Sequence, residues 1–441
     1  MANAIDRIRF NVGGKIFETT TTTLANAGRN SMLGALLDEN WNLFSSAGEY
    51  FIDRNPACFG VLLDLLRTGE LHIPPIMPKK LLYREALFYG LLDHVRSARW
   101  GPFDGNRLHL SSSVAGRAPG DPTAVRASPD GGCCIAHGTL AHLYDWMLDQ
   151  HNPINLDYQQ INDVGYIDTD TIVLTARQPP GRAGGGMGLF SPSSGELRHR
   201  FPVSHDNKVK SFTAGALCFS NPGYKIFASC KGRCNESGIG VWDQITGNQS
   251  DFFYQPPGCS FGDADKLQWI EGDNFLMVAT LFPRTDNCFI GVLDFREKNM
   301  VWSWTDERTM AAAASLDEKR VLHAIVMEDN RSICVVNQYE DLGFLDLRRN
   351  GGGVRWSSRS KLMKGKVRGE ESCYPKLVMH RGQLFSSMND VISVFCGPEW
   401  VLTTTLGTNY GGPICDISIG GDRLFALHSE TNVFDIWETP A

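Results

Sequence analysis

The sequence lacks a long apolar segment. Residues 275–282 form one of its longest uncharged apolar stretches, far short of the roughly 20 residues that a membrane-spanning helix needs. Its first residues also lack the basic and then apolar pattern of a secretory signal. We therefore expect no insertion into a membrane and a cytoplasmic location, with the nucleus as the alternative.

Positive charge is also scarce. The 441 residues include 42 Lys and Arg against 49 Asp and Glu, which gives a formal net charge of −7. The deficit lies after residue 100, where 31 basic residues face 39 acidic ones. Binding to nucleic acid phosphates requires a basic surface. This balance therefore argues against a nucleic acid partner.

No group of residues has the spacing of a catalytic or metal site. Cys133, Cys134 and His137 could be imagined as a nucleophile with its base, but residues 134 and 137 of one strand would point to opposite faces. Cys230 and Cys234 have no second ligand pair downstream. The 12 cysteines show no repeating spacing and are interpreted as reduced thiols. We predict no catalytic residue, no cofactor and no metal.

What the sequence does contain begins with a hairpin. Ile8, Phe10 and Val12 alternate with polar residues, as in a half-buried strand. Gly13 and Gly14 then provide a turn before residues 15–19 return as a second strand.

A helix with clear start and stop signals follows. Asn55 is a typical N-cap and Pro56 a typical first helical residue. Gly69 is a typical C-terminal stop. Between them, one apolar stripe recurs at helical spacing, formed by Phe59, Leu62, Leu63 and Leu66. The stripe must pack against another part of the fold.

These motifs resemble the BTB/POZ domain of the potassium-channel tetramerisation type, also called the KCTD type. The resemblance is carried by Asn11-Val12-Gly13-Gly14, Phe51-Ile52-Asp53-Arg54, Phe59, Leu66-Arg67-Thr68-Gly69 and Glu85-Ala86 with Phe88. It covers roughly the first hundred residues, and we assign this domain to residues 5–100.

The resemblance implies an α/β module that forms homo-oligomers, commonly rings, and that docks onto cullin-3 in many family members. We expect self-association or cullin docking on the surface around Phe51, Asp53 and Arg54. Helices over residues 31–39 and 56–67 are expected to contribute to the same surface.

After residue 100, short apolar runs separated by Gly, Asn, Asp and Pro predict an all-β region. Several predicted strands end in a hydrophobic residue followed by Asp, at Leu143-Tyr144-Asp145, Val241-Trp242-Asp243, Val292-Leu293-Asp294, Phe344-Leu345-Asp346 and Val433-Phe434-Asp435. Weaker copies are Leu189-Phe190-Ser191 and Ser393-Val394-Phe395. The seven copies begin at residues 143, 189, 241, 292, 344, 393 and 433, so they are 40–52 residues apart.

Repeats of this length are typical of propeller blades with four short strands each. The region 107–441 thus resembles a seven-bladed WD-repeat-like β-propeller. Asp243 is expected to accept hydrogen bonds from the turn that follows it, and Gly247 to adopt a positive φ. The last blade, residues 414–437, supplies only three strands. We predict that residues 107–111 complete it and close the ring.

A basic segment interrupts the acidic second region. It consists of Arg359, Lys361, Lys364, Lys366 and Arg368. Its position predicts a loop between blades, and our hypothesis is that Lys361, Lys364 and Lys366 contact an acidic partner protein. A solvated loop and a nuclear import signal are the alternatives.

The combined architecture implies a substrate-specific adaptor of a cullin-3 RING ubiquitin ligase. The BTB/POZ domain would form the oligomer and recruit cullin-3, and the propeller would hold a protein substrate. The alternative is an oligomeric scaffold that binds a channel, receptor or signalling protein without ubiquitin ligation. Neither function requires this chain to be an enzyme.

Overall fold

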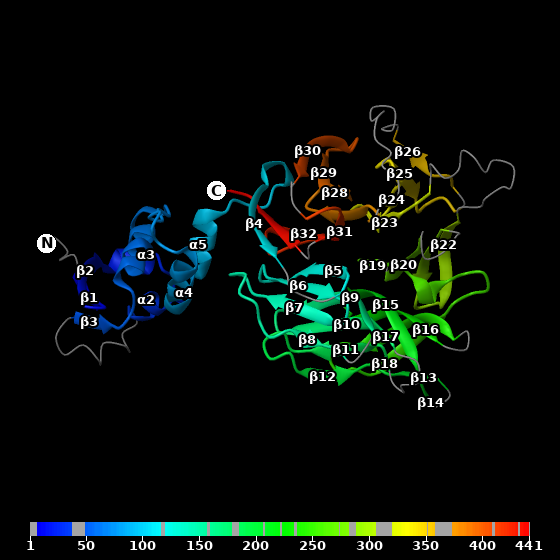
Figure 1. Cartoon of the computed structure of the whole chain (residues 1–441), viewed down its shortest axis with the longest axis horizontal. Helices are drawn as coiled ribbons and strands as arrows, with labels where there is room; N and C mark the ends of the chain where they lie inside the picture. The colour runs from blue at the N-terminus through cyan, green and yellow to red at the C-terminus, as the bar shows by residue number, and fades with distance from the viewer. Residues whose placement is uncertain are drawn as a thin grey trace. The chain divides into compact units, whose positions relative to one another are not determined.

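The computed structural model describes residues 7–37, 49–115, 120–156, 159–178, 185–205, 208–220, 223–232, 236–272, 274–281, 288–305, 320–350, 352–357, 373–407, 411–430 and 433–440. The chain divides into two compact units, Met1–Asp104 with Thr439–Ala441, and Gly105–Glu438 (Figure 1). Every helix among the described residues is too short or too polar to span a membrane.

The first unit contains a three-stranded sheet. Strands β1 (Arg7–Val12) and β2 (Lys15–Thr20) form the predicted antiparallel hairpin, and β3 (Glu49–Ile52) pairs in parallel on the other side of β1. Both turn glycines have positive φ, 52° for Gly13 and 87° for Gly14, a region that glycine enters without steric cost. The hairpin prediction is confirmed.

Helices complete this unit. They are α1 (Thr21–Ala25), α2 (Met32–Ala35), α3 (Pro56–Thr68), α4 (Lys79–Tyr89) and α5 (Leu92–Arg99). The Asn55 side chain accepts hydrogen bonds from the amides of residues 57 and 58, and Gly69 ends α3 in the left-handed conformation. The apolar stripe of α3 is buried, and the Phe59 ring lies 5.6 Å from the Phe10 ring. The predicted helix and its core face are confirmed.

The second unit contains seven four-stranded antiparallel sheets in the part of the chain that the structure describes. The first three sheets are β5 (Pro122–Ala127), β6 (Cys133–His137), β7 (Leu140–Tyr144), β8 (Ile154–Asn155); β9 (Gln160–Asp168), β10 (Thr171–Arg177), β11 (Met187–Phe190), β12 (Leu197–Arg200); and β15 (Phe212–Ser220), β16 (Lys225–Gly232), β17 (Ser237–Asp243), β18 (Gln249–Tyr254).

The next three sheets are β19 (Lys266–Ile270), β20 (Phe275–Thr280), β21 (Phe289–Asp294), β22 (Asn299–Thr305); β23 (His323–Val326), β24 (Ser332–Val336), β25 (Leu342–Asp346), β26 (Arg355–Trp356); and β27 (Lys376–His380), β28 (Gln383–Met388), β29 (Val391–Cys396), β30 (Val401–Gly407). The last sheet is β31 (Ile414–Gly420), β32 (Arg423–His428), β33 (Val433–Glu438) and β4 (His109–Ala115).

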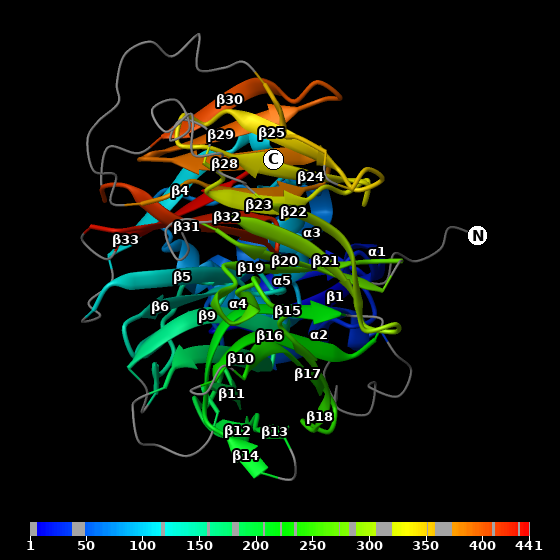
Figure 2. The same ribbon diagram turned by 90° about the vertical axis from the view of Figure 1, so that its right-hand side faces the viewer.

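Three short elements accompany these sheets. The hairpin of β13 (Val203–His205) and β14 (Lys208–Lys210) lies at the outer edge of the unit, beyond β12 and β18 (Figure 2). The 3-10 turns η2 (Gly105–Arg107) and η3 (Phe261–Asp263) precede β4 and β19.

The first strands of the sheets surround a common centre. In chain order, β5, β9, β15, β19, β23, β27 and β31 each contact the next, and β31 contacts β5 again (Figure 1). Side chains link these strands. Gln268 of β19, for example, bonds both the amide and the carbonyl of Val326 in β23. We infer that the sheets are the blades of one closed ring, with the fourth strands outermost.

Strand β4 completes the last sheet, as predicted. It pairs antiparallel with β33, and Ser113 of β4 lies opposite Asp435 of β33. The Ser113 hydroxyl donates to the Asp435 carboxylate at 2.5 Å. The strand begins at residue 109 and continues to 115, slightly later than the predicted 107–111. The ring-closure prediction is therefore confirmed.

The last sheet is joined to the first by a packed seam. The Tyr144 and Phe434 rings lie 4.9 Å apart within an apolar core shared by both sheets. Arg423 of β32 donates to the Glu438 carboxylate at 2.7 Å and to the carbonyls of Gly131 and Trp146 at 2.8 and 2.6 Å. Because this guanidinium is buried, these acceptors replace water around its charge.

The repeated Asp acts as predicted in the clearest copy. The Asp243 carboxylate accepts hydrogen bonds from the amides of Ile245 and Thr246, and Gly247 has a φ of 69°. These bonds from the turn, led by the Thr246 amide, hold the pKa of Asp243 below its usual range.

The last copy of the repeat was aligned three residues too early. Asp243 pairs with Lys225, the first residue of its neighbouring strand, and the residue in the matching place of the last sheet is Glu438, paired with Arg423. Asp435 lies inside β33 instead. The alignment failed because both Phe434-Asp435 and Trp437-Glu438 read as an apolar residue followed by an acid.

Asp435 also contacts a buried histidine, His428 of β32. His428 Nε2 lies 2.9 Å from the Asp435 carboxylate and Nδ1 lies 2.7 Å from the Gly412 carbonyl oxygen. Burial alone would lower the pKa of His428, but these two acceptors outweigh burial, so the pKa is raised. Both ring nitrogens face acceptors, an arrangement that favours the charged imidazolium.

The raised pKa predicts a pH-dependent contribution to stability. A group whose pKa is higher when folded stabilises the fold fully below its unfolded pKa, about 6.5 for His, and loses this as pH rises through the folded value. The difference in unfolding free energy between wild type and His428→Gln, measured by urea denaturation, should therefore shrink as pH rises above about 6.5. His72→Gln, at an exposed site, should show no such trend. A constant difference for His428→Gln would contradict the assignment.

Candidate protein-interaction surfaces

The three predicted contact residues of the first unit lie at the end of β3, but they do not share one environment. Phe51 is 67% exposed and Asp53 is also exposed. Arg54 is half-buried: its guanidinium forms a two-pronged ion pair with Glu85 of α4, at 2.9 and 3.2 Å, and lies 4.2 Å from the centre of the Phe88 ring. Arg54 therefore holds β3 against α4, which is a structural role.

Phe51 belongs to a row of residues across the outer face of the sheet. Asn11 of β1 is paired with Ile16 of β2 on one side and with Phe51 of β3 on the other. Directly paired residues project from the same face of a sheet. Ile16 is 45% exposed, and within the described part of the chain no group donates a hydrogen bond to the buried Oδ1 of Asn11. This row, called the sheet-face row below, presents apolar surface and an unsatisfied acceptor.

Additional apolar side chains are exposed on α4. Leu81 and Phe88 lie seven residues apart on this helix and are both exposed, as is Leu87. Residues with this spacing lie on one helix face. The first unit thus exposes apolar side chains on α4 as well as on its sheet.

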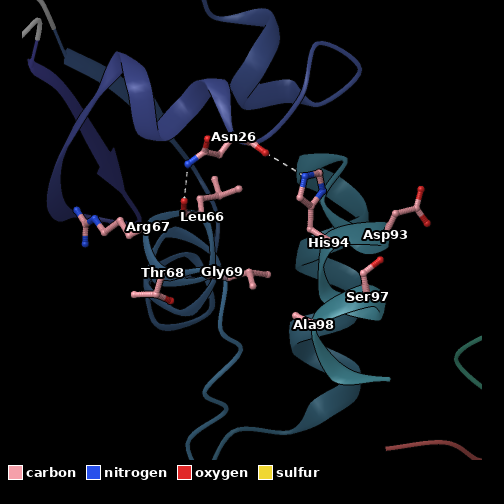
Figure 3. A pocket seen from close by; sticks show the side chains of 10 residues that line it. Asn26, Leu66, Arg67, Thr68, Gly69, Asp93, His94, Ser97 and Ala98 are labelled. Carbon is pink, nitrogen blue, oxygen red and sulfur yellow. Dashed lines mark hydrogen bonds between the residues drawn. The ribbon is translucent and has the colours of Figure 1, made fainter. Parts of the chain in front are cut away.

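A pocket of about 600 Å³ lies between the end of α3 and α5 (Figure 3). It is lined by Asn26, Leu65, Leu66, Arg67, Thr68, Gly69, Asp93, His94, Ser97 and Ala98. Asn26 fixes its walls, because its side-chain amide donates to the Leu66 carbonyl at 2.9 Å and its own carbonyl lies 3.0 Å from His94 Nε2. The pocket combines apolar walls with polar groups, as do sites that receive a partner's side chain.

The basic segment lies outside the described residues. This applies to Arg359, Lys361, Lys364, Lys366 and Arg368. The hypothesis that Lys361, Lys364 and Lys366 contact an acidic partner stays a prediction.

The centre of the second unit holds a channel cavity of about 270 Å³, to which the first strands of all seven sheets contribute. Its charged or titratable lining residues are Arg126, Asp163, Asp265, Lys266, His323, Lys376 and Asp416. Sequence reasoning identified none of them, because they are spread over almost 300 residues and only the ring brings them together.

An ion-paired arginine occupies one side of this channel. Arg126 of β5 donates to Asp163 of β9 at 2.6 Å and to Asp416 of β31 at 2.5 Å. Burial would lower the pKa of Arg126, but the two carboxylates more than offset this and raise it. Arg126 therefore keeps its charge and links three adjacent blades.

The residues considered as a nucleophile with its base are buried in the structure. Cys133, Cys134 and His137 are all almost fully inaccessible. Burial raises the pKa of the Cys134 thiol and lowers that of His137 to about 4, so both groups are neutral at pH 7. A neutral thiol is a poor nucleophile. No two cysteines in the described part of the chain form a disulfide, and no cluster of metal-ligating side chains occurs there.

Both units match known protein families. Residues 8–98 match the BTB/POZ domain, and residues 116–439 match the family described as At2g24240-like, C-terminal beta propeller. Both ranges lie within the predicted domains. The molecule is therefore a protein-interaction adaptor of the class that joins a BTB/POZ domain to a β-propeller, which confirms the predicted order of these two folds.

Relatives that match nearly the whole chain define its family more narrowly. The Arabidopsis thaliana BTB/POZ domain-containing protein At2g24240 is 69% identical over 99% of this chain and 98% of its own length. The Arabidopsis protein At4g30940 is 70% identical over 98% of both chains. This chain belongs to the At2g24240-like family. Its first domain alone is similar to human KCTD17, with 37% identity over 19% of this chain and 27% of that protein, so the KCTD resemblance is confirmed.

The contrast between Arg54 and Asp53 can be tested by mutation. Arg54→Met would leave the Glu85 carboxylate, whose side chain is 7% exposed, without its cation. Breaking a buried pair in this way costs about 3 kcal/mol of unfolding free energy, measurable by urea denaturation. Asp53→Asn, at an exposed neighbouring position, should change stability by less than about 0.5 kcal/mol. Equal effects would show that Arg54 has no special structural role.

Proposed function

We propose that this chain is a substrate-specific adaptor of a cullin-3 RING ubiquitin ligase. The BTB/POZ domain forms a homo-oligomer and docks onto cullin-3, and the propeller holds a protein substrate. The chain supplies proximity and leaves the transfer chemistry to other subunits, so it is not itself an enzyme. Oligomerisation adds avidity for substrates with several binding motifs. We place this activity in the cytoplasm or nucleus.

The sheet-face row supports self-association. Ile16 and Phe51 expose apolar surface on either side of Asn11, whose Oδ1 is already shielded from water without a donor in the described residues. A second copy would cover the apolar side chains and could supply the missing donor. Both changes would favour association, because exposed apolar surface and an unsatisfied buried acceptor each cost free energy.

The pocket between α3 and α5 is our proposed docking site for cullin-3. Energetically dominant contacts in interfaces are side chains inserted into preformed pockets. The Asn26 bonds to Leu66 and His94 make this pocket part of the folded domain. Helix α3 is within the region that the sequence predicted for docking.

The substrate-binding part of the proposal rests on the propeller. Its strands form a rigid frame, and binding surfaces on such frames are built from the connecting loops. The segment with Lys361, Lys364 and Lys366 connects β26 to β27 and is our proposed contact for an acidic substrate region.

A scaffold without ubiquitin ligation is the second candidate. One relative of the first domain is the mouse potassium channel regulatory protein, 38% identical over 20% of this chain and 33% of its own length. That name favours a role in which the BTB/POZ domain binds a channel or a signalling protein directly.

Light scattering of the full-length chain tests self-association. We expect a mass several times the 48.8 kDa of one chain, reduced toward one chain by Phe51→Ser without a change in melting temperature. Ile245→Ser removes another exposed apolar side chain, 78% exposed in the propeller, and should leave the mass unchanged. A monomeric wild type would overturn the oligomer proposal.

Binding of the full-length chain to the cullin-3 N-terminal domain separates the two candidate functions. An adaptor should bind with a Kd below roughly 1 μM. Ser97→Arg, which fills the α3–α5 pocket from an exposed position, should weaken binding at least tenfold. An oligomer with no affinity for cullin-3 would support the scaffold. Equal binding by Ser97→Arg would exclude the pocket as the docking site.

A further inference from the structure

The channel of the propeller contains two lysine side chains that form no direct ion pair with the residues that the structure describes. Lys266 lies on β19 and Lys376 on β27, and both side chains line the 270 Å³ cavity. Neither has an ion pair or a side-chain hydrogen bond with any described residue. Both lysines are half-buried, and a charge that is partly withdrawn from water without a partner costs free energy.

The carboxylates of the channel are already occupied. Asp163 accepts from Arg126 and from the amides of Val164 and Leu217, at 2.6, 2.8 and 3.1 Å. Asp416 accepts from Arg126 and from the Val125 amide, at 2.5 and 3.0 Å.

Asp265, the third acid, accepts from the Leu281 amide at 2.6 Å. Arg126 thus engages two of the three carboxylates that line the cavity, and neither Lys266 nor Lys376 forms a direct ion pair with any of the three.

The imidazole of His323 adds a donor to the same cavity. Its Nδ1 accepts a hydrogen bond from the Leu377 amide at 3.2 Å, so the neutral ring carries its proton on Nε2. Burial, followed by the charges of Lys376, Lys266 and Arg126, lowers the pKa of His323 well below its usual value. The pKa of Lys266 is also lowered, first by burial and then by Arg126. The carboxylates of Asp163 and Asp416 act in the opposite direction on Lys266, but burial and Arg126 outweigh them, so its pKa stays lowered.

We propose that this channel binds a small oxyanion of the phosphate or phosphomonoester class between Lys266 and Lys376. A doubly charged oxyanion would neutralise both ammonium groups, and its several acceptor oxygens match donors that converge from different blades. The cavity is smaller than the roughly 300–1,000 Å³ of pockets for drug-sized ligands, which favours a small anion. This inference does not rest on the cullin-3 proposal.

Isothermal calorimetry with inorganic phosphate tests the site. The full-length chain, dialysed into chloride buffer, is titrated at constant ionic strength. We expect saturable binding of one phosphate per chain, at least tenfold weaker in Lys266→Met or Lys376→Met and absent in the double variant. Lys231→Met, which removes a lysine paired with Asp263 on the surface, should bind like wild type. No saturable heat in wild type, or equal binding by the double variant, would overturn the proposal.

Melting temperatures separate a ligand site from a structural one. Phosphate stabilises many proteins through exclusion from their surface, so only a rise that the double variant lacks counts as support. In chloride buffer the double variant should melt no lower than wild type, because it loses an unpaired charge. A large loss of melting temperature there would indicate that the lysines are structural and would contradict the proposal.

Two further measurements complete the test. Tighter binding of glycerol phosphate than of phosphate would identify a phosphomonoester as the ligand class, and equal or weaker binding would identify the free ion. If the lysine variants fail to fold, a crystal structure of the unmodified chain grown in phosphate decides. It should show the anion between the two Nζ atoms, and an empty channel would contradict the site.

Discussion

The pairing of β4 with β33 is the contact on which the propeller depends. Each sheet packs its faces against two neighbours, and a ring left open would expose the faces and edges of its end sheets. The paired residues Ser113 and Asp435 are more than 300 positions apart in the chain, so ordering them costs loop-closure entropy. That cost is met by a full strand ladder, the apolar seam and the buried partners of Arg423 and His428.

Closure also ties together the two parts of the sequence. Helix α5 ends at Arg99 and β4 begins at His109, so the segment that leaves the BTB/POZ domain is the one that completes the ring. The chain re-enters the first unit only with its final residues, Thr439–Ala441.

Local rules predicted much of this fold. The Asn55 cap, the Gly69 stop, the Gly13-Gly14 turn and the Asp243 turn all depend on neighbours within a few residues, and the structure has each of them. The predicted position of Asp435 in the repeat was wrong. Its partners, Ser113 and His428, belong to other strands and cannot be recognised from neighbouring residues. The same limit applies to Arg54, which reads as a surface residue in the sequence but pairs with Glu85 of another helix. The channel residues Lys266 and Lys376 become neighbours only through ring closure.

Native-state hydrogen exchange of the β4 amides tests this account most directly. If β4 closes the ring, those amides in residues 109–115 that bond β33 should exchange only with the global unfolding of the propeller, with the same free energy as the central strands β32 and β33. Rapid exchange of β4, at the rate of an exposed loop, while β32 and β33 stay protected, would contradict closure by this strand.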